Sequence, residues 1–128
     1  MTDSPIFPLW HLAHASDWAA AQDVGRYEFS TRGRTLAEEG FIHCSYPHQV
    51  GAVARTFYAD DPEELLVLEV DREVLALMGI EVRVEPVGDQ HYPHIYGPIP
   101  VAAVSTIRAA AFDEGRGFVL GTPEPADG

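Results

Sequence analysis

Three consecutive side chains that can donate, accept or transfer protons follow two bulky apolar residues in the run Phe41-Ile42-His43-Cys44-Ser45. Phe41 and Ile42 favour a short, half-buried strand. Alternation along this strand points Phe41, His43 and Ser45 to one face and turns Cys44, with Ile42, towards the core. Such a run either opens a polar pocket at a sheet edge or combines a structural histidine with a helix-capping serine. Both interpretations stay open at this point.

Histidines are the main candidates for proton chemistry, because imidazole changes charge near neutral pH. Four of the six lie in or beside predicted strands or motifs: His11, His43, His91 and His94. A metal site is one interpretation, but the pairs His11/His14 and His91/His94 have the three-residue spacing that brings ligands together only on a helix. Both pairs lie in strand-like or loop sequence. We therefore predict no metal.

Two non-metal interpretations remain for the same residues. Nucleophilic catalysis by Cys44 or Ser45 lacks a recognisable Gly-x-Ser-x-Gly elbow, and the predicted alternation turns Cys44 away from His43. The interpretation that we prefer is a pocket lined by His11, His43, Ser45 and the segment 93–98, which would bind a small polar ligand and stabilise charge on a leaving group.

Composition excludes several classes of protein. The length of 128 residues predicts one domain, and the net charge of −12 without any lysine argues against binding to nucleic acid or to an acidic membrane surface. We find no apolar run of membrane-spanning length and no signal-peptide pattern. The single cysteine, Cys44, indicates a reducing compartment, so we expect a cytoplasmic protein.

Three arginines flank one loop before the central run, and they are the candidates for holding a small phosphorylated ligand. They are Arg26, Arg32 and Arg34, with Arg34 as our choice for a ligand-binding residue. The alternative is that all three are solvated loop residues.

Periodicity predicts a small α+β domain with a mixed or antiparallel, split sheet and short helices. The expected strands cover residues 6–13, 41–45, 65–70, 80–86 and 104–110, and the expected helices cover 17–24, 35–39, 47–58 and a short segment after Asp71. Residues 27–34 are expected to form an irregular loop. Residues 88–100 are rich in turn and polar-aromatic residues, so His94 and Tyr96 either serve the pocket or only satisfy a rigid, proline-bounded turn.

Domain boundaries follow from a change in composition near the end of the chain. Residues 1–112 are expected to form the single α+β domain. Residues 113–128 form an acidic tail that contains glycine and proline, and we predict that it is largely disordered beyond about Leu120.

Three motifs resemble those of a bacterial family, the domain of unknown function 952. They are Trp10-His11-Leu12-Ala13, Gly40-Phe41-Ile42-His43-Cys44-Ser45 and His94-Ile95-Tyr96-Gly97-Pro98-Ile99. The resemblance covers roughly residues 6–108 and brings no established reaction. It implies an architecture like that of ADP-ribosyltransferases, whose split sheet binds nicotinamide dinucleotide (NAD) in a central cleft.

In enzymes of that architecture, a His or Arg on the first core strand holds a ribose, and His11 is similar to it. A Ser or aromatic residue supports the nicotinamide, and Ser45 with His43 is similar to that. A glutamate on a later strand, near the position of the His94-Ile95-Tyr96 run, has no clear match here, since Glu69 or Glu85 would need an unsupported alignment. A carboxylate is the natural stabiliser of an oxocarbenium-like charge, so transferase activity is in question.

Our leading hypothesis is an enzyme that binds a nucleotide or phosphorylated metabolite, with NAD as the substrate that the resemblance implies. Its catalytic residues would be His11, His43 and His94, and its ligand-binding residues Ser45, Tyr96 and Arg34. The alternative is a ligand-binding or regulatory domain without catalysis, and a weaker one is a metal-dependent hydrolase. Substrate, pathway and oligomeric state stay open.

Overall fold

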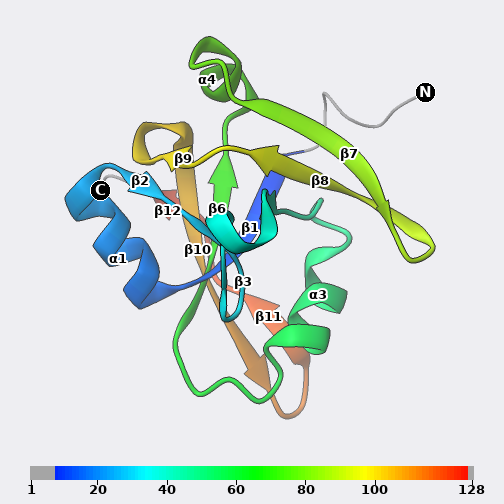
Figure 1. The fold of residues 1–128 in the computed structure, drawn as a ribbon. Helices are drawn as coiled ribbons and strands as arrows, with labels where there is room; N and C mark the ends of the chain where they lie inside the picture. The colour runs from blue at the N-terminus through cyan, green and yellow to red at the C-terminus, as the bar shows by residue number, and fades with distance from the viewer. Residues whose placement is uncertain (1–7, 127–128) are drawn as a thin grey trace.

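The computed structural model describes residues 8–126, which form twelve strands and four short α-helices (Figure 1). The helices are α1 (Ala15–Val24), α2 (Leu36–Glu39), α3 (Val50–Phe57) and α4 (Arg72–Leu77), and the single turn η2 (Val101–Ala103) is a 3₁₀-helix. No helix among the described residues is long and apolar enough to cross a membrane.

The larger sheet is built around β6 (Leu65–Val70), the nearly all-apolar strand. One neighbour of β6 is β1 (Leu9–His14) and the other is β10 (Val104–Asp113), both antiparallel to it. On its other side β10 pairs with β11 (Gly117–Leu120) and β12 (Glu124–Pro125). A strand with neighbours on both edges and apolar clusters on both faces needs apolar side chains on both faces, which explains the sequence of β6.

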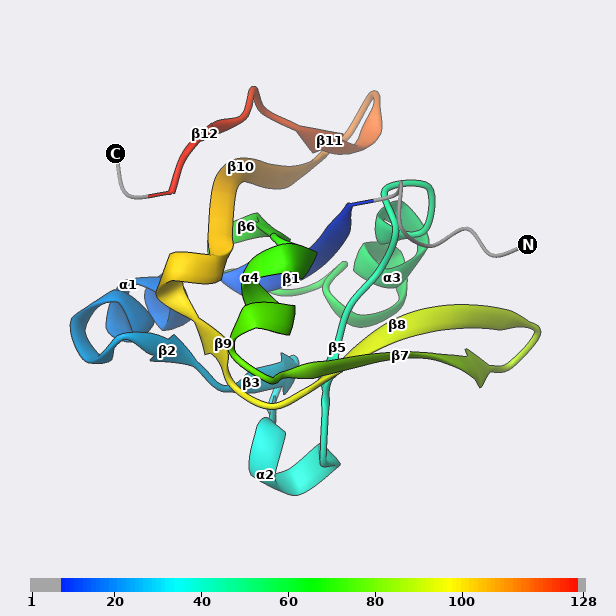
Figure 2. The ribbon, with the colours of Figure 1, turned by 90° about the horizontal axis from the view of Figure 1, so that it is seen from above.

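The smaller sheet has the order β5-β8-β7 and carries the candidate site residues His43, His94 and Tyr96. Its strands are β5 (Ile42–His43), β7 (Glu81–Val87) and β8 (Gln90–Tyr96), again antiparallel. Figure 2 shows β7 and β8 on the opposite side of the molecule from β10, β11 and β12. A bridge between Trp10 and Ser45 joins the two sheets through a reciprocal pair of backbone hydrogen bonds, each 2.8 Å long.

Two further antiparallel pairs complete the strands. The first joins β2 (Arg26–Tyr27) to β9 (Ile99–Pro100), and the second is the hairpin of β3 (Phe29–Thr31) and β4 (Arg34–Thr35). All pairings among the described residues are antiparallel, so the domain is α+β with short helices, as expected from the sequence.

The core consists of two apolar clusters, one on each face of the larger sheet. Leu9 and Ala13 of β1 enter the cluster between the two sheets, together with Ile42 and Ile95 of the smaller sheet. Trp10 and Leu12, which alternate with them, enter the second cluster, and α3 covers that cluster with Val50 and Ala54 and with Tyr58 at its C-cap. The side chains of β1 therefore alternate between two apolar clusters, and both faces of the strand are buried.

Helix ends follow their local sequence in most places. Thr35 and Glu38 form a capping box at the start of α2, in which the Thr35 hydroxyl accepts from the Glu38 amide and the Glu38 carboxylate accepts from the Thr35 amide. Gly40 ends α2 in the left-handed conformation with φ of 88°, which favours glycine. α1 begins at Ala15, directly after β1, and not at the expected residue 17, and the residue at its N-cap is His14.

Two predicted connections are strands instead. The expected loop 27–34 contains the β3–β4 hairpin. The expected turn 88–100 contains β8, the central strand of its sheet, although Pro93 lies in its middle. Pro93 is tolerated because its carbonyl still accepts a hydrogen bond from the Cys44 amide (3.0 Å), while its missing N–H removes only one donor.

Part of the tail that we expected to be disordered is described in the structure and pairs with the larger sheet. β11 and β12 pair with β10, Phe118 packs against Phe112, and Ala126 is buried. The reason is that one edge of β10 would otherwise have unpaired backbone groups, and the short run Phe118-Val119-Leu120 pairs with that edge in spite of the acidic and proline-containing surroundings. Residues 127–128 of the tail, and residues 6 and 7 of the predicted first strand, lie outside the described residues.

Candidate functional site

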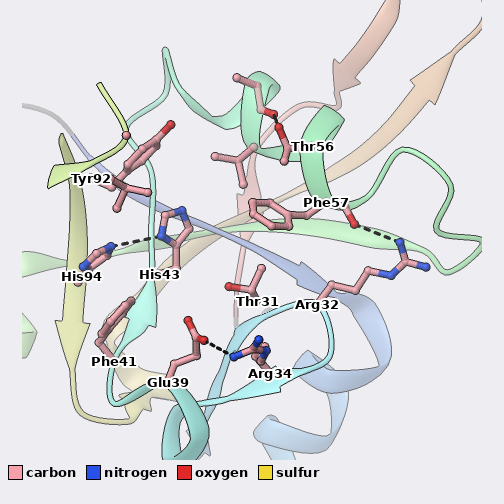
Figure 3. Close-up of a pocket in the computed structure, with 14 residues that line it drawn as sticks. Thr31, Arg32, Arg34, Glu39, Phe41, His43, Thr56, Phe57, Tyr92 and His94 are labelled. Atoms are coloured by element: carbon pink, nitrogen blue, oxygen red, sulfur yellow. Dashed lines mark hydrogen bonds and ion pairs between the residues drawn. The ribbon is translucent and has the colours of Figure 1, made fainter. Parts of the chain in front are cut away.

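A cavity of about 490 Å³ opens between the smaller sheet, the β3–β4 hairpin and α3 (Figure 3). This volume is in the range of small-molecule sites. The residues that line it come from distant parts of the chain: Thr31, Arg32, Arg34, Glu39, Phe41, His43, Ala52, Val53, Thr56, Phe57, Val87, Gly88, Tyr92 and His94. The lining combines aromatic rings, two guanidinium groups and two imidazoles, which suits a ligand that has both a flat ring and a negative charge.

The pairing of β5 with β8 brings two of the predicted histidines together. His43 lies opposite His94 and Ile42 lies opposite Ile95. Because side chains alternate, Ile42 and Ile95 enter the core while His43 and His94 face the cavity. Phe41 stacks on the His94 ring, with the ring centres 4.0 Å apart and the planes at 14°, and so holds that ring in place.

Glu85, which the sequence analysis did not include among the candidate site residues, completes this group. Glu85 of β7 accepts hydrogen bonds at Oε1 from His94 Nδ1 (2.7 Å) and from the Tyr96 hydroxyl (2.6 Å). These bonds, from Tyr96 first and then His94, lower the pKa of Glu85 below its ordinary value, so Glu85 is an anion at neutral pH. On the other side of the His94 ring, Nε2 lies 3.3 Å from His43 Nδ1.

Burial lowers the pKa of His43 from 6.5 to about 4, and the neighbouring His94 and His11 add to this shift. His43 is therefore neutral at physiological pH. Its main-chain amide donates to Ser30 Oγ (3.1 Å), and Tyr92 lies against its ring with the ring centres 5.0 Å apart. The imidazole is thus held at the cavity wall by both backbone and side-chain contacts.

His11 lies behind this wall and does not line the cavity. Its Nδ1 donates to the His43 carbonyl (2.8 Å), and its Nε2 lies 2.9 Å from the Tyr27 hydroxyl. Burial lowers the pKa of His11 to about 4, with the bond to the His43 carbonyl opposing the shift, so the ring is neutral and Nε2 accepts from Tyr27. His11 is in contact with the site through the backbone of β5, and both of its nitrogens have protein partners.

The other predicted ligand-binding residues lie in different places. Arg34 lines the cavity and is paired with Glu39 at 2.8 Å. Ser45 is buried at the bridge to Trp10 and does not line the cavity. Tyr96 lies behind His94 at Glu85 and under the Arg83 guanidinium, which lies 4.4 Å from the ring centre.

Cys44 faces the core, as the alternation predicts, and is 1% exposed. Burial raises the pKa of its thiol far above the ordinary value, so no thiolate forms near neutral pH. The geometry therefore argues against Cys44 as a nucleophile.

Arg32 connects the cavity to a second cluster of charged side chains. Its guanidinium binds Asp60 (2.7 Å), Asp61 (3.1 Å) and the Phe57 carbonyl (3.1 Å). Asp61 also binds His14, and His14, Asp61 and Glu63 have ligand-type atoms within 4.8 Å of one another. Because Arg32 and His14 share the same Asp61 oxygen, this oxygen already has two cationic or hydrogen-bonding partners.

Sequence reasoning missed several residues of the cavity wall. Thr31 lies in a segment that we predicted to be a loop, Phe57 in a predicted helix and Tyr92 in a predicted turn. Glu81, Arg83 and Glu85 alternate with Val82 and Val84 in the sequence, and this alternation, which indicates a strand with one wet face, was the available signal for Glu85. That wet face is the one that carries His94 and Tyr96, because β7 and β8 share their faces in the observed register.

Comparisons with known proteins agree on one relationship. Two crystal structures of protein CC0527 from Caulobacter crescentus, one of them of a double mutant, are similar to this chain over 94% of its length and 96% of theirs. Both have 26% sequence identity, with TM-scores of 0.70 and 0.69. A search of curated proteins finds no significant match. The family model described as "Protein of unknown function (DUF952)" matches residues 12–107, and the chain therefore belongs to the DUF952 family.

Proposed function

We propose that the 490 Å³ cavity binds a nucleotide or another small phosphorylated metabolite, and that the protein is a small cytoplasmic enzyme acting on it. The observation that carries this proposal is the joint exposure of two guanidinium groups and one neutral imidazole to a single cavity with aromatic walls. Arg32 and Arg34 supply the charge for a phosphate, Phe57 and Tyr92 supply surfaces for a flat base, and His43 supplies an acid–base group.

Arg34 is the better of the two phosphate ligands. Arg32 already makes three contacts with Asp60, Asp61 and a carbonyl, whereas Arg34 has the single partner Glu39 among the contacts described above. A phosphate that approaches Arg34 has to compete with the Glu39 carboxylate. Arg34 and Glu39 therefore have opposite effects on the affinity for an anion.

NAD is a candidate ligand, and an ADP-ribosyltransferase-like architecture is part of the proposal. The two antiparallel sheets with a cavity beside them favour this. The ribose-binding role that the resemblance implies for His11 is not favoured, because both ring nitrogens of His11 have protein partners. Among the residues that line the cavity, the carboxylate is Glu39, on α2, and neither Glu69 nor Glu85 lines it.

Calorimetric titration with ADP, NAD and adenosine tests the proposal. We expect ADP to bind and adenosine to bind much more weakly. Arg34→Gln should weaken ADP binding about tenfold, since one hydrogen bond to a charged group contributes ~1.5 kcal/mol or more. Arg26→Gln is the matched control, because Arg26 is paired with Glu28 and lies outside this cavity.

Glu39→Gln should strengthen ADP binding, because it frees Arg34 from its partner. Equal binding of ADP and adenosine, or equal effects of the Arg34 and Arg26 variants, would refute a phosphate site at Arg34.

The second candidate function is a ligand-binding domain without catalysis. It is favoured by the position of Glu69, which binds Trp10, Thr106 and Arg108 instead of entering the cavity. Release of nicotinamide from bound NAD separates the two functions: binding without release indicates the binding domain, and release that is lost in Glu39→Gln indicates a transferase or glycohydrolase.

A further inference from the structure

Glu85, His94 and His43 form a continuous chain of hydrogen bonds that ends at the cavity. Glu85 Oε1 lies 2.7 Å from His94 Nδ1, and His94 Nε2 lies 3.3 Å from His43 Nδ1. His43 Nε2 is the end of the chain, and among residues 8–126 no hydrogen-bond partner is found for it (Figure 3). The chain therefore leads from a half-exposed carboxylate through two imidazoles to an atom that a ligand can reach.

Hydrogen-bond chemistry allows this chain two protonation states while Glu85 is an anion and His43 is neutral. A carboxylate only accepts, so His94 Nδ1 carries a proton in both states. In the first state His94 is neutral, its Nε2 accepts a proton from His43 Nδ1–H, and His43 Nε2 presents a lone pair to the cavity. In the second state His94 is an imidazolium, its Nε2–H donates to His43 Nδ1, and His43 Nε2–H faces the cavity.

We propose that these two states are the start and end of a proton relay, in which His43 takes a proton from the ligand and His94 stores the positive charge. The relay rests on the proposed function, because it needs a ligand in the cavity. The ligand class that follows is one with a neutral hydroxyl, or a water beside it, held against His43 while its anionic group lies at Arg34.

The step balances without any other reactant. The O–H bond of the ligand breaks, and its proton forms an N–H bond at His43 Nε2. The proton on His43 Nδ1 moves to His94 Nε2, and the ligand oxygen keeps the electron pair and becomes a nucleophile. His43 ends as the other neutral tautomer, His94 as a cation, and Glu85 is unchanged. The reverse sequence delivers a proton to a leaving group.

The surroundings explain why the charge rests on His94 and not on His43. Next to His94 are the Glu85 anion and the stacked face of Phe41, both of which attract a cation. His43 instead faces Tyr92, His94 and, across its own carbonyl, His11, and burial opposes a charge on its ring. The charged groups on the far side of the cavity are Arg32, Arg34 and Glu39, of which Arg34 and Glu39 neutralise each other.

Nuclear magnetic resonance of the ligand-free protein with ¹⁵N-labelled histidine tests the relay separately from the proposed function. Correlations between ring nitrogens and carbon-bound protons identify the protonated nitrogen of each histidine, and the variants His43→Gln and His94→Gln assign the signals. At neutral to high pH we expect His43 to carry its proton on Nδ1. On acidification, His94 should become doubly protonated at the same midpoint at which His43 changes to the Nε2–H tautomer and stays neutral.

Glu85→Gln should move this coupled midpoint to lower pH, because it removes the anion that is hydrogen-bonded to the His94 ring. Glu81→Gln is the matched control, since Glu81 is an exposed carboxylate on the same strand whose partner is Arg83. Nε2–H on His43 while His94 is neutral would overturn the relay, as would double protonation of His43 before His94. Neither outcome depends on whether ADP binds. The titration of the unmodified protein tests the relay even if Glu85→Gln does not fold.

Discussion

Acidification should unfold this protein through the buried imidazole of His11. The ring is 2% exposed and is held between the His43 carbonyl and the Tyr27 hydroxyl, with a pKa lowered from 6.5 to about 4. The unfolded chain therefore binds a proton at His11 more readily than the folded one, and stability falls as the pH decreases from 6.5 towards 4. Integration over that shift gives a loss of about 2 kcal/mol at pH 5 and about 3 kcal/mol at pH 4.

The variant His11→Asn isolates this contribution, because its amide keeps a donor for the His43 carbonyl but does not titrate. Urea unfolding of both proteins at several pH values gives the difference in their free energies of unfolding. We expect that difference to shrink by about 2 kcal/mol between pH 7 and pH 5. His91→Asn, at an exposed position of β8, is the matched control and should show no such change. A difference between wild type and His11→Asn that stays constant with pH would refute a buried, neutral His11.

Three further predictions follow from other parts of the fold. Burial lowers the pKa of His14, but Asp61, with Glu63 and Asp17, raises it overall. The stability that His14 adds should therefore be present below pH 6.5 and lost as the pH rises through the higher pKa of the folded state. In urea unfolding, His14→Asn should lower the free energy of unfolding more at pH 6 than at pH 9. Truncation before Thr122 removes β12 and the buried Ala126, and should lower the free energy of unfolding by ~1 kcal/mol or more; an unchanged melting temperature would mean that the tail does not dock. Cys44 should react with a thiol reagent only as fast as the protein opens, and rapid labelling of the native protein would place the thiol outside the core.

The parts of the fold that local sequence determines could be predicted. The capping box at Thr35, the left-handed Gly25 and Gly40, and the all-apolar β6 each depend on residues that are close in the chain. Strand β8 could not be predicted in this way, because Pro93 and its polar-aromatic neighbours have the composition of a turn. What makes it a strand is its pairing on both sides, with β5 and β7, and this pairing is a tertiary contact.

The candidate site also combines features that local sequence predicts with features that depend on tertiary contacts. Alternation in the run that contains His43 correctly separates Cys44 from the exposed face. It could not show that His11 approaches His43 through a backbone carbonyl, or that Glu85 accepts from His94, because both contacts depend on how the two sheets are placed. A charged residue on the wet face of a strand has the same sequence pattern whether it meets water or a buried imidazole.

Strand β7 has a consequence for solubility. It forms one edge of the three-stranded sheet, and Val84 and Val87 on it are 42% and 47% exposed. A long edge with exposed valines is a template for pairing with a second molecule, and charged side chains and proline discourage that pairing. On β7 these are Glu81, Arg83, Glu85 and Pro86. Glu85 therefore serves both the chain of imidazoles and the protection of the edge, so a substitution there that changes proton transfer should also increase concentration-dependent association, which light scattering measures.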